Sequence, residues 1–278
     1  MNSRSLLNIF LLLVLGGLIS FFMLDNEAPV VSNKLTTLQP NDISRITIPR
    51  EDRVDIILSK NSNSPNESEW YMLQPYAIKA HAFRVNTLLK LSQATTHKNY
   101  ATNDLNLADY GLDTPRARII FNDTEILFGK TNPLNNKRYL LCNNTLSLIN
   151  DDTYPLVSAE PASLVDLHLL DSKNIQSIET ADWHIFKNSS NHWDSNSQFS
   201  ADQLQTLLEN WQHAQAFAVH KYMPRKKLGN IVLTIDEQKM HFEISDDDPW
   251  LILARPDMGI EYHLDKALKN SLLGIPDA

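Results

Sequence analysis

The chain has 278 residues, a length that fits one large domain or two of ordinary size. Its 33 acidic and 25 basic residues give a formal net charge of −8, which disfavours nucleic acid as a partner. Only five glycines follow Gly17, too few for glycine-rich phosphate loops to be expected, and the single cysteine, Cys142, excludes an intramolecular disulfide and a multi-cysteine zinc site.

The N-terminus carries an apolar run from Leu6 to Leu24 that is broken only by Asn8 and Ser20. A helix of this length spans the roughly 30 Å hydrocarbon core of a membrane. Arg4 precedes the run and acidic residues follow it, so the positive-inside rule keeps the N-terminus in the cytoplasm and exports the rest.

A cleaved signal peptide is the alternative interpretation of this run. Its apolar region would be shorter and would end in a small-x-small site, whereas the run here ends in Phe21-Phe22-Met23-Leu24. We therefore predict an uncleaved signal anchor in residues 1–27, with a transmembrane helix at about 6–24, followed by a polar stalk in residues 28–42.

The rest of the chain has the pattern of a degenerate tandem repeat. In both halves a strand pattern is followed by a tryptophan after a polar loop, a helix, and two hairpin patterns, in the same order. The alternative is chance resemblance of short apolar runs, which the matched order of five elements makes the weaker interpretation. We predict unit one at 43–150, a linker at 151–171 and unit two at 172–278. The expected fold is α+β: two related units, each an antiparallel sheet with one covering helix.

The helix of each predicted unit has an apolar stripe. Ser200 and Gln203 form a capping box, after which Leu204, Leu207, Leu208 and Trp211 share one face. Val85, Leu88 and Leu89 form the same stripe in unit one. Such stripes are typical of core-facing helices.

The segment DLNLADYGLDTP, Asp104 to Pro115, predicts a structural corner. Asn103 is expected to cap a short helix from Asp104 to Tyr110, and Gly111 falls where a helix ends in the left-handed conformation. Leu107 and Leu112 are then placed for the hydrophobic contact of a Schellman stop. The alternative is that Asp109, Tyr110 and Asp113 form an exposed recognition patch.

A series of motifs also carries a resemblance: Trp70, Pro75, Val85-x-x-Leu88-Leu89, LADYGLDTP, ILFGK and RYL in this order. The chain resembles a bacterial family of single-span, membrane-anchored proteins of unknown function, whose members are often encoded beside a gliding-motility-type ABC transporter. The most specific part is Tyr110 to Pro115, with Phe128-Gly129 and Arg138-Tyr139 behind it. Unit two has KYMPRKKLGN in place of this corner. The resemblance implies a place in the bacterial inner membrane, with the body in the periplasm, and carries over no catalytic residue.

We find no catalytic motif, and we expect no enzymatic activity, no cofactor and no metal. The nine histidines form neither His-x-His nor His-Glu-x-x-His, and Asp246-Asp247-Asp248 lacks the rest of a calcium loop. One basic cluster, with Lys221, Arg225, Lys226 and Lys227, is a candidate surface for an acidic partner or for anionic head groups; an ordinary polar loop is the alternative.

The function expected from these observations is that of a non-enzymatic accessory component of an ABC-type transport complex, with the permease or an auxiliary subunit as partner. A binding module for a cell-envelope glycan or peptide is the alternative, and it predicts an exposed aromatic cleft built by Trp70, Trp193 or Trp250. A hydrolase is the third hypothesis, and it predicts convergent acids or histidines between the units.

Overall fold

The computed structural model describes residues 33–61 and 69–274. The predicted anchor lies outside these ranges. In the part of the chain that is described, none of the helices has both the length and the apolar character needed to cross a membrane. Residues 33–42 of the expected stalk pack onto the first sheet's unit, where Leu35 is buried and its amide donates to the carbonyl of Ala94 at 2.9 Å.

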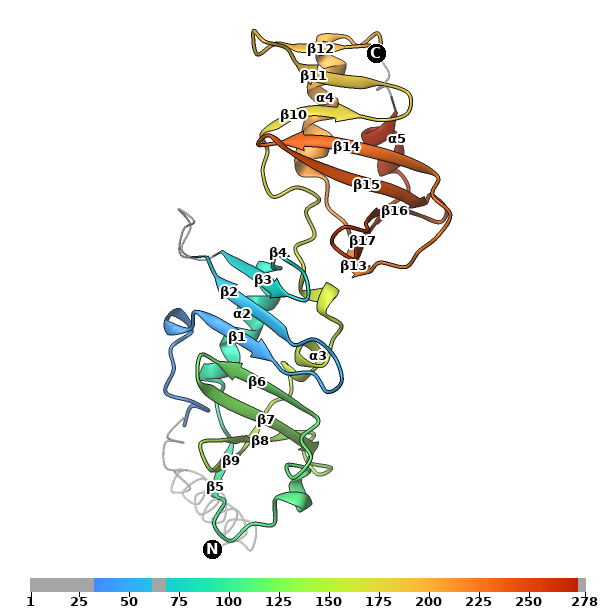
Figure 1. The fold of residues 1–278 in the computed structure, drawn as a ribbon. Helices are drawn as coiled ribbons and strands as arrows, with labels where there is room; N and C mark the ends of the chain where they lie inside the picture. Colours follow the sequence, from blue (N-terminus) through green and yellow to red (C-terminus); the bar gives the residue numbers. More distant parts are fainter. Residues whose placement is uncertain (1–32, 62–68, 275–278) are drawn as a thin grey trace, which may run out of the picture.

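The chain is mostly β and forms two antiparallel sheets that lie end to end (Figure 1). We call β1–β9 with helix α2 unit one. Its nine-stranded sheet has the order β4-β3-β2-β1-β6-β7-β8-β9-β5. The elements are η1 (Pro40–Asp42), β1 (Arg45–Ile48), β2 (Ile56–Lys60), β3 (Trp70–Gln74), β4 (Ile78–Lys79), α2 (Ala82–Lys90), η2 (Leu91–Gln93), β5 (Lys98–Ala101), η3 (Leu107–Tyr110), β6 (Ala117–Phe121), β7 (Thr124–Thr131), β8 (Arg138–Cys142) and β9 (Thr145–Ile149).

We call β10–β17 with helices α4 and α5 unit two. Its eight-stranded sheet has the order β12-β11-β10-β14-β15-β16-β17-β13. The elements are β10 (Ile175–Glu179), β11 (His184–Lys187), β12 (Trp193–Ser195), α4 (Ala201–His213), β13 (Ala218–Lys221), β14 (Gly229–Ile235), β15 (Gln238–Asp246), β16 (Trp250–Arg255), β17 (Ile260–Asp265) and α5 (Leu268–Leu273).

The two sheets repeat one strand order. If β4 is left out and the strands of each unit are numbered afresh along the chain, the two sheets have the same strand order. In each unit the long helix comes just before an edge strand along the chain. Helix α2 lies between β4 and β5, and α4 lies between β12 and β13. β5 and β13 are edge strands of their sheets. The two sheet units therefore place β5 and β13 in equivalent positions.

The hairpins of both sheets close on turns that suit the right-handed twist of the strands. Asn143 and Asn144 both have positive φ, 48° and 59°, between β8 and β9. Asp236 and Glu237 have φ of 47° and 66° between β14 and β15. Two successive left-handed residues are typical of a type I′ turn, and short polar side chains tolerate this conformation.

The linker joins the units through backbone pairing on both sides. Residue 165 forms an isolated bridge with Ala80 of unit one, and His168 forms one with Gln215 of unit two. The segment contains two short helical turns of four residues each, α3 (Tyr154–Val157) and the 3-10 helix η4 (Pro161–Leu164). Buried side chains of both sheets and of the linker form one contiguous apolar cluster.

Helix α4 is positioned by its cap and by its apolar face. The Gln203 amide donates to the Ser200 hydroxyl at 3.2 Å, and the Ser200 amide donates to the side-chain carbonyl of Gln203 at 2.8 Å, which confirms the predicted capping box. Leu207, Leu208 and Trp211 are buried as expected. The Trp211 indole also donates to the carbonyl of Leu272, so α4 holds α5 in place.

We expect Ser200→Ala to lower the free energy of unfolding by about 1 kcal/mol, because it removes the acceptor for an amide in the first turn of α4. Urea unfolding of the two proteins measures this difference. Ser190→Ala is the control, since Ser190 is exposed in a turn and its hydroxyl caps no helix. An equal loss in the two variants would contradict the capping assignment.

Candidate functional site

The corner, Asp104 to Pro115, folds around a short 3-10 helix that ends as the sequence predicts. Gly111 has a φ of 66°, its amide donates to the carbonyl of Ala108 at 3.1 Å, and the Leu112 amide donates to the carbonyl of Leu107 at 3.0 Å. These bonds confirm the expected Schellman stop. The start was predicted wrongly: the helix begins at Leu107, and its cap is Asn106, whose side chain accepts from the amide of Ala108.

The corner is fixed by close contact with strand β7. A Cβ atom at Gly129 would lie 2.4 Å from the backbone oxygen of Tyr110 and 3.0 Å from the Leu112 side chain, which is buried. The β7–β8 ladder shifts register between Phe128 and Thr131, as at a β-bulge. Glycine is therefore required at 129, because only a residue without a side chain lets the corner reach the strand.

The neighbouring strand β8 contacts the Gly129 backbone with one face and the corner with the other. Arg138 points inward, where its guanidinium donates to the carbonyl of Gly129 at 2.6 Å, pairs with Asp151 at 2.7 Å and lies over the ring of Tyr154. Tyr139 points to the other face and meets Tyr110 edge-on, with ring centroids 4.9 Å apart. The corner, Gly129, Arg138 and Tyr139, which are separated in the sequence, thus pack together as one constellation of side chains and backbone.

An open hollow of about 410 Å³ lies beside this constellation, and we call it the tyrosine groove. It is formed by β5, β8, β9, the corner and the β7–β8 loop. Its lining residues are His97, Lys98, Tyr100, Tyr110, Asn132, Leu134, Asn135, Lys137, Tyr139 and Leu148. Three of these side chains are tyrosines and none is an acid, although the whole chain is acidic.

The chemistry of the groove is that of a binding surface. Tyr100 and Leu134 are 41% and 93% exposed, whereas Tyr110 and Tyr139 are half-buried and held by their mutual contact. Burial, together with the nearby Tyr110 and Tyr100, raises the pKa of the Tyr139 hydroxyl, so this group stays protonated at neutral pH. The Asn132 amide donates to its oxygen at 2.9 Å, and the hydroxyl proton of Tyr139 remains available to an acceptor on a ligand.

The structure separates the residues that the sequence nominated in the corner. Tyr110 lines the groove. Asp109 and Asp113 are exposed on the corner and are not among the lining residues; the Asp109 carboxylate accepts a long hydrogen bond, 3.4 Å, from Asn106. The corner is thus structural, as predicted, and its tyrosine also forms part of a surface hollow.

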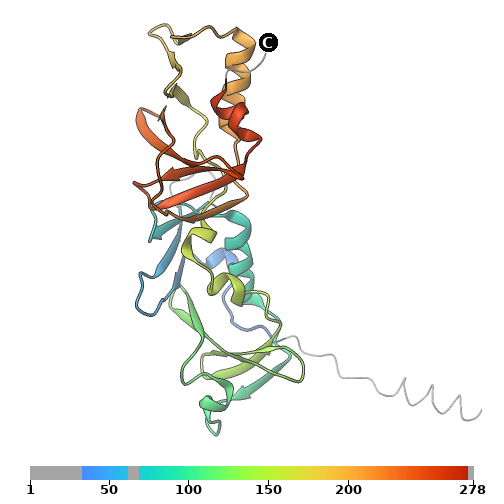
Figure 2. The same cartoon turned by 90° about the vertical axis from the view of Figure 1, so that its right-hand side faces the viewer.

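The basic cluster lies on unit two, and the structure does not bring it to the corner (Figures 1 and 2). Arg225 pairs bidentately with the buried Glu261, at 2.7 and 3.0 Å, and Lys227 pairs with Glu243 at 3.1 Å. Lys221 and Lys226 are exposed. The cluster follows strand β13 rather than a helix, and two of its four nominated cations already hold the loop to the sheet.

Tyr110 was nominated for recognition from the sequence, but Tyr100 and Tyr139 were not, and the alternative hypothesis of a binding module placed an aromatic cleft at tryptophans. Trp70 is buried, Trp193 is half-buried, and Trp250 is 46% exposed and packs edge-on against Phe217 in unit two. The available signal was the alternation in β8, where buried Arg138 and Leu140 leave Tyr139 on the opposite face.

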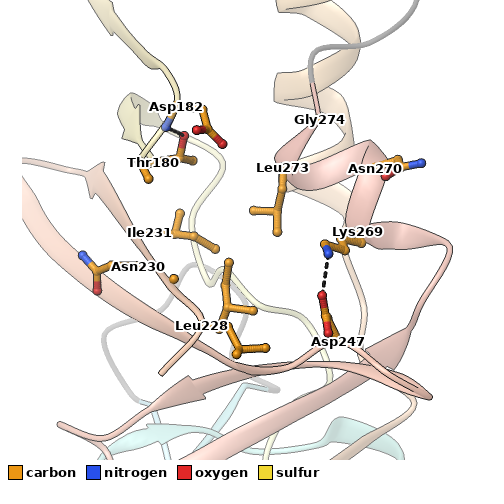
Figure 3. Close-up of a pocket in the computed structure, with 13 residues that line it drawn as sticks. Thr180, Asp182, Leu228, Asn230, Ile231, Asp247, Lys269, Asn270, Leu273 and Gly274 are labelled. Carbon is orange, nitrogen blue, oxygen red and sulfur yellow. Dashed lines mark hydrogen bonds and ion pairs between the residues drawn. The ribbon is translucent and has the colours of Figure 1, made fainter. Parts of the chain in front are cut away.

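A second hollow, of about 320 Å³, lies in unit two between the β10–β11 turn, the start of β14 and α5 (Figure 3). Leu228, Ile231 and Leu273 form its apolar side, and Lys269 on its rim pairs with Asp247. None of its residues was nominated from the sequence. Because its lysine, Lys269, is already paired with Asp247, this hollow offers fewer free recognition groups than the tyrosine groove.

Titratable side chains do not gather into a metal-binding group. Among residues 33–61 and 69–274, no three His, Cys, Asp or Glu residues are placed to hold a metal ion. Cys142 is buried in β8, and burial raises the pKa of its thiol.

Comparison with known proteins bears on the family alone. The family described as Domain of unknown function (DUF4340) matches residues 70–240, more than half of the chain. The chain belongs to this family. The matched DUF4340 region contains the corner, the tyrosine groove and most of unit two up to β15. No curated protein and no solved structure matches the chain.

We expect Gly129→Ala to destabilise unit one by about 1–3 kcal/mol, because the added methyl group overlaps the Tyr110 carbonyl and forces the backbone to move. Thermal and urea unfolding measure the loss. Gly229→Ala is the matched control, since its added methyl meets only the end of the Ile244 side chain, which can rotate away. Equal stability of Gly129→Ala and the wild type would contradict the close docking of the corner.

The Arg225–Glu261 pair predicts a pH dependence of stability. Burial acts to raise the pKa of Glu261, but hydrogen bonds from Arg225, His263 and the Met223 amide hold this pKa below its ordinary value of 4.5. Because the folded pKa is below the unfolded one, the contribution to stability is complete above about pH 4.5 and is lost as pH falls through the folded value.

Glu261→Gln is therefore expected to lower the free energy of unfolding by about 1.5–3 kcal/mol near pH 7. The difference from the wild type is expected to narrow below about pH 4. Urea unfolding across this pH range measures the effect. Glu243→Gln, which removes the more exposed partner of Lys227, is expected to lose less than about 1 kcal/mol. A Glu261→Gln deficit that stays constant down to pH 3 would show that the charge of Glu261 is not the cause.

Proposed function

We propose that this DUF4340 protein is a non-enzymatic accessory component that acts by binding other proteins, and that it serves an ABC-type transport complex of the gliding-motility type. The observation that carries the proposal is the open tyrosine groove, which the corner helps to form and which lies within the region that the family model matches. Exposed aromatic and apolar side chains around fixed aromatic rings are typical of interaction surfaces.

The position of the groove fits a partner in the membrane plane. The first described residues, Asn33–Thr36, pair with Ser92–Thr96 immediately before β5. The chain therefore enters unit one beside the groove. If the N-terminal run is the predicted signal anchor, it tethers the groove side of unit one, rather than unit two, closer to the inner membrane, on the periplasmic side, where a permease or an auxiliary subunit is within reach.

Binding of a cell-envelope glycan is a second candidate, and one observation favours it. Tyr100, Tyr110 and Tyr139 combine with the amides of Asn132 and Asn135 in one open groove. Aromatic faces with amide donors and acceptors also suit sugars. A direct binding assay of the purified protein with envelope glycans, repeated with Tyr100→Ser, separates this function from protein binding.

The direct test of the accessory function is a mild crosslinking pull-down of the tagged full-length protein from native membranes, read by mass spectrometry. We expect enrichment of an ABC permease, its ATPase or an auxiliary subunit over an unrelated tagged membrane protein. Recovery of the protein alone, from cells shown to express such a transporter, would contradict the proposal.

A further inference from the structure

Strand β5 is an edge strand that runs along the tyrosine groove. It is the last strand of sheet one, hydrogen-bonded to β9 on one side, and all four of its residues are exposed. Lys98 and Tyr100 of this strand line the groove. An open strand edge offers backbone donors and acceptors to another extended chain, and neighbouring hollows then receive its side chains.

Unit two shows what covers the equivalent edge. Its strand β13 lies against η4 of the linker, a segment that comes from outside the sheet. Just before β13, the Ala216 amide donates to the carbonyl of Leu167 at 2.8 Å, and the Leu169 amide donates to that of Ala214 at 3.2 Å. In this fold, therefore, the position of β13 is one against which a polypeptide segment packs.

In unit one the corresponding backbone pairing ends at the same point. Asn33–Thr36 pairs as far as Thr96, two residues before β5, just as the linker pairs as far as Ala216, two residues before β13. The difference between the units is that η4 lies against β13 itself. Among residues 33–61 and 69–274, no segment pairs with the outer side of β5. In this part of the chain β5 has no counterpart of the β13–η4 contact, and its residues are exposed.

The charge of the groove selects the kind of segment. Lys98, Lys137 and His97 line it, and Asp and Glu are absent from its lining. The nearby acids Asp109 and Asp113 lie outside it. On a protein with a net charge of −8 this is a local cationic surface, and it favours a segment rich in Asp and Glu.

Two apolar side chains supply anchors for such a segment. Leu134 of the β7–β8 loop is 93% exposed, and Tyr100 of β5 is 41% exposed. Both line the groove, so a strand added beside β5 places alternate side chains against them. The rings of Tyr110 and Tyr139 are already fixed against each other and need little ordering when a segment binds.

We propose that the tyrosine groove and the edge of β5 together bind an extended acidic segment of a partner polypeptide, which adds to sheet one as a strand. This inference rests on the proposed function only in that the protein binds other proteins; it does not depend on which transport complex is served.

The test places a photo-crosslinking phenylalanine derivative at position 134 of the full-length protein in native membranes, and the captured segment is mapped by mass spectrometry. The same probe at Phe83 is the matched control, because Phe83 is also an exposed large side chain, 72% exposed, but lies on α2. We expect capture at position 134 of one acidic segment, with at least a tenfold lower yield in Lys98→Glu/Lys137→Glu, whose thermal stability should match the wild type.

Strand addition has its own readout. Hydrogen exchange of the purified full-length protein is measured with and without a synthetic peptide of the captured sequence, and the amides of Lys98–Ala101 are expected to exchange at least tenfold more slowly with it. No slowing at β5 would overturn strand addition.

Other outcomes at position 134 also overturn the inference: capture no stronger than at Phe83, a neutral or basic segment, a glycan or lipid, or residues before Asn33 of the same chain. If the pull-down recovers partners but position 134 captures none of them, only this inference fails. If neither experiment recovers a protein, the proposed function fails as well.

Discussion

The candidate site depends on the close approach of the Tyr110 carbonyl to Gly129. No side chain fits between them, since a Cβ atom would lie 2.4 Å from that oxygen. This contact fixes the corner on the bulge of β7, places Tyr110 against Tyr139, and leaves the Gly129 carbonyl to accept from Arg138. The corner and the strand pair behind it therefore form one rigid wall of the tyrosine groove.

The two units share a strand order but differ in what lies against the equivalent edge strands. β5 and β13 occupy equivalent positions, but in residues 33–61 and 69–274 only β13 has a linker element, η4, against it. The loops that follow these two edge strands also differ. The loop of unit two is held down by the Arg225–Glu261 pair, whereas the corner of unit one is held by glycine-dependent packing and projects a tyrosine into a hollow. The two units thus share a scaffold and differ at the surface that carries the proposed function.

Local signals in the sequence predicted local structure well. The Ser200–Gln203 cap, the Gly111 stop and the buried stripes of both helices depend on residues within one or two turns of each other, and all of them are present. The start of the corner helix was misplaced because Asn103 and Asn106 are both good caps by residue type, and residue type alone does not choose between them.

The groove itself was not predictable from the sequence. Tyr100, Tyr110 and Tyr139 lie on a strand, a corner and another strand, with no common period, and their convergence follows from the order of strands in sheet one. The same reason applies to the pair of Arg225 and Glu261, which are distant in sequence; of the two, only Arg225 was named from the sequence, as part of a candidate basic surface. Spacing along the chain does not report contacts that the sheet creates.

The most direct test of the account compares partner recovery by Leu134→Glu and Phe83→Glu in the same crosslinking pull-down, with both variants confirmed to be folded. Both substitutions add one negative charge at an exposed apolar side chain, but only position 134 lines the tyrosine groove. The account predicts that Leu134→Glu loses at least nine-tenths of the recovered partner and that Phe83→Glu retains it. Equal recovery by the two variants would show that the groove is not the binding surface.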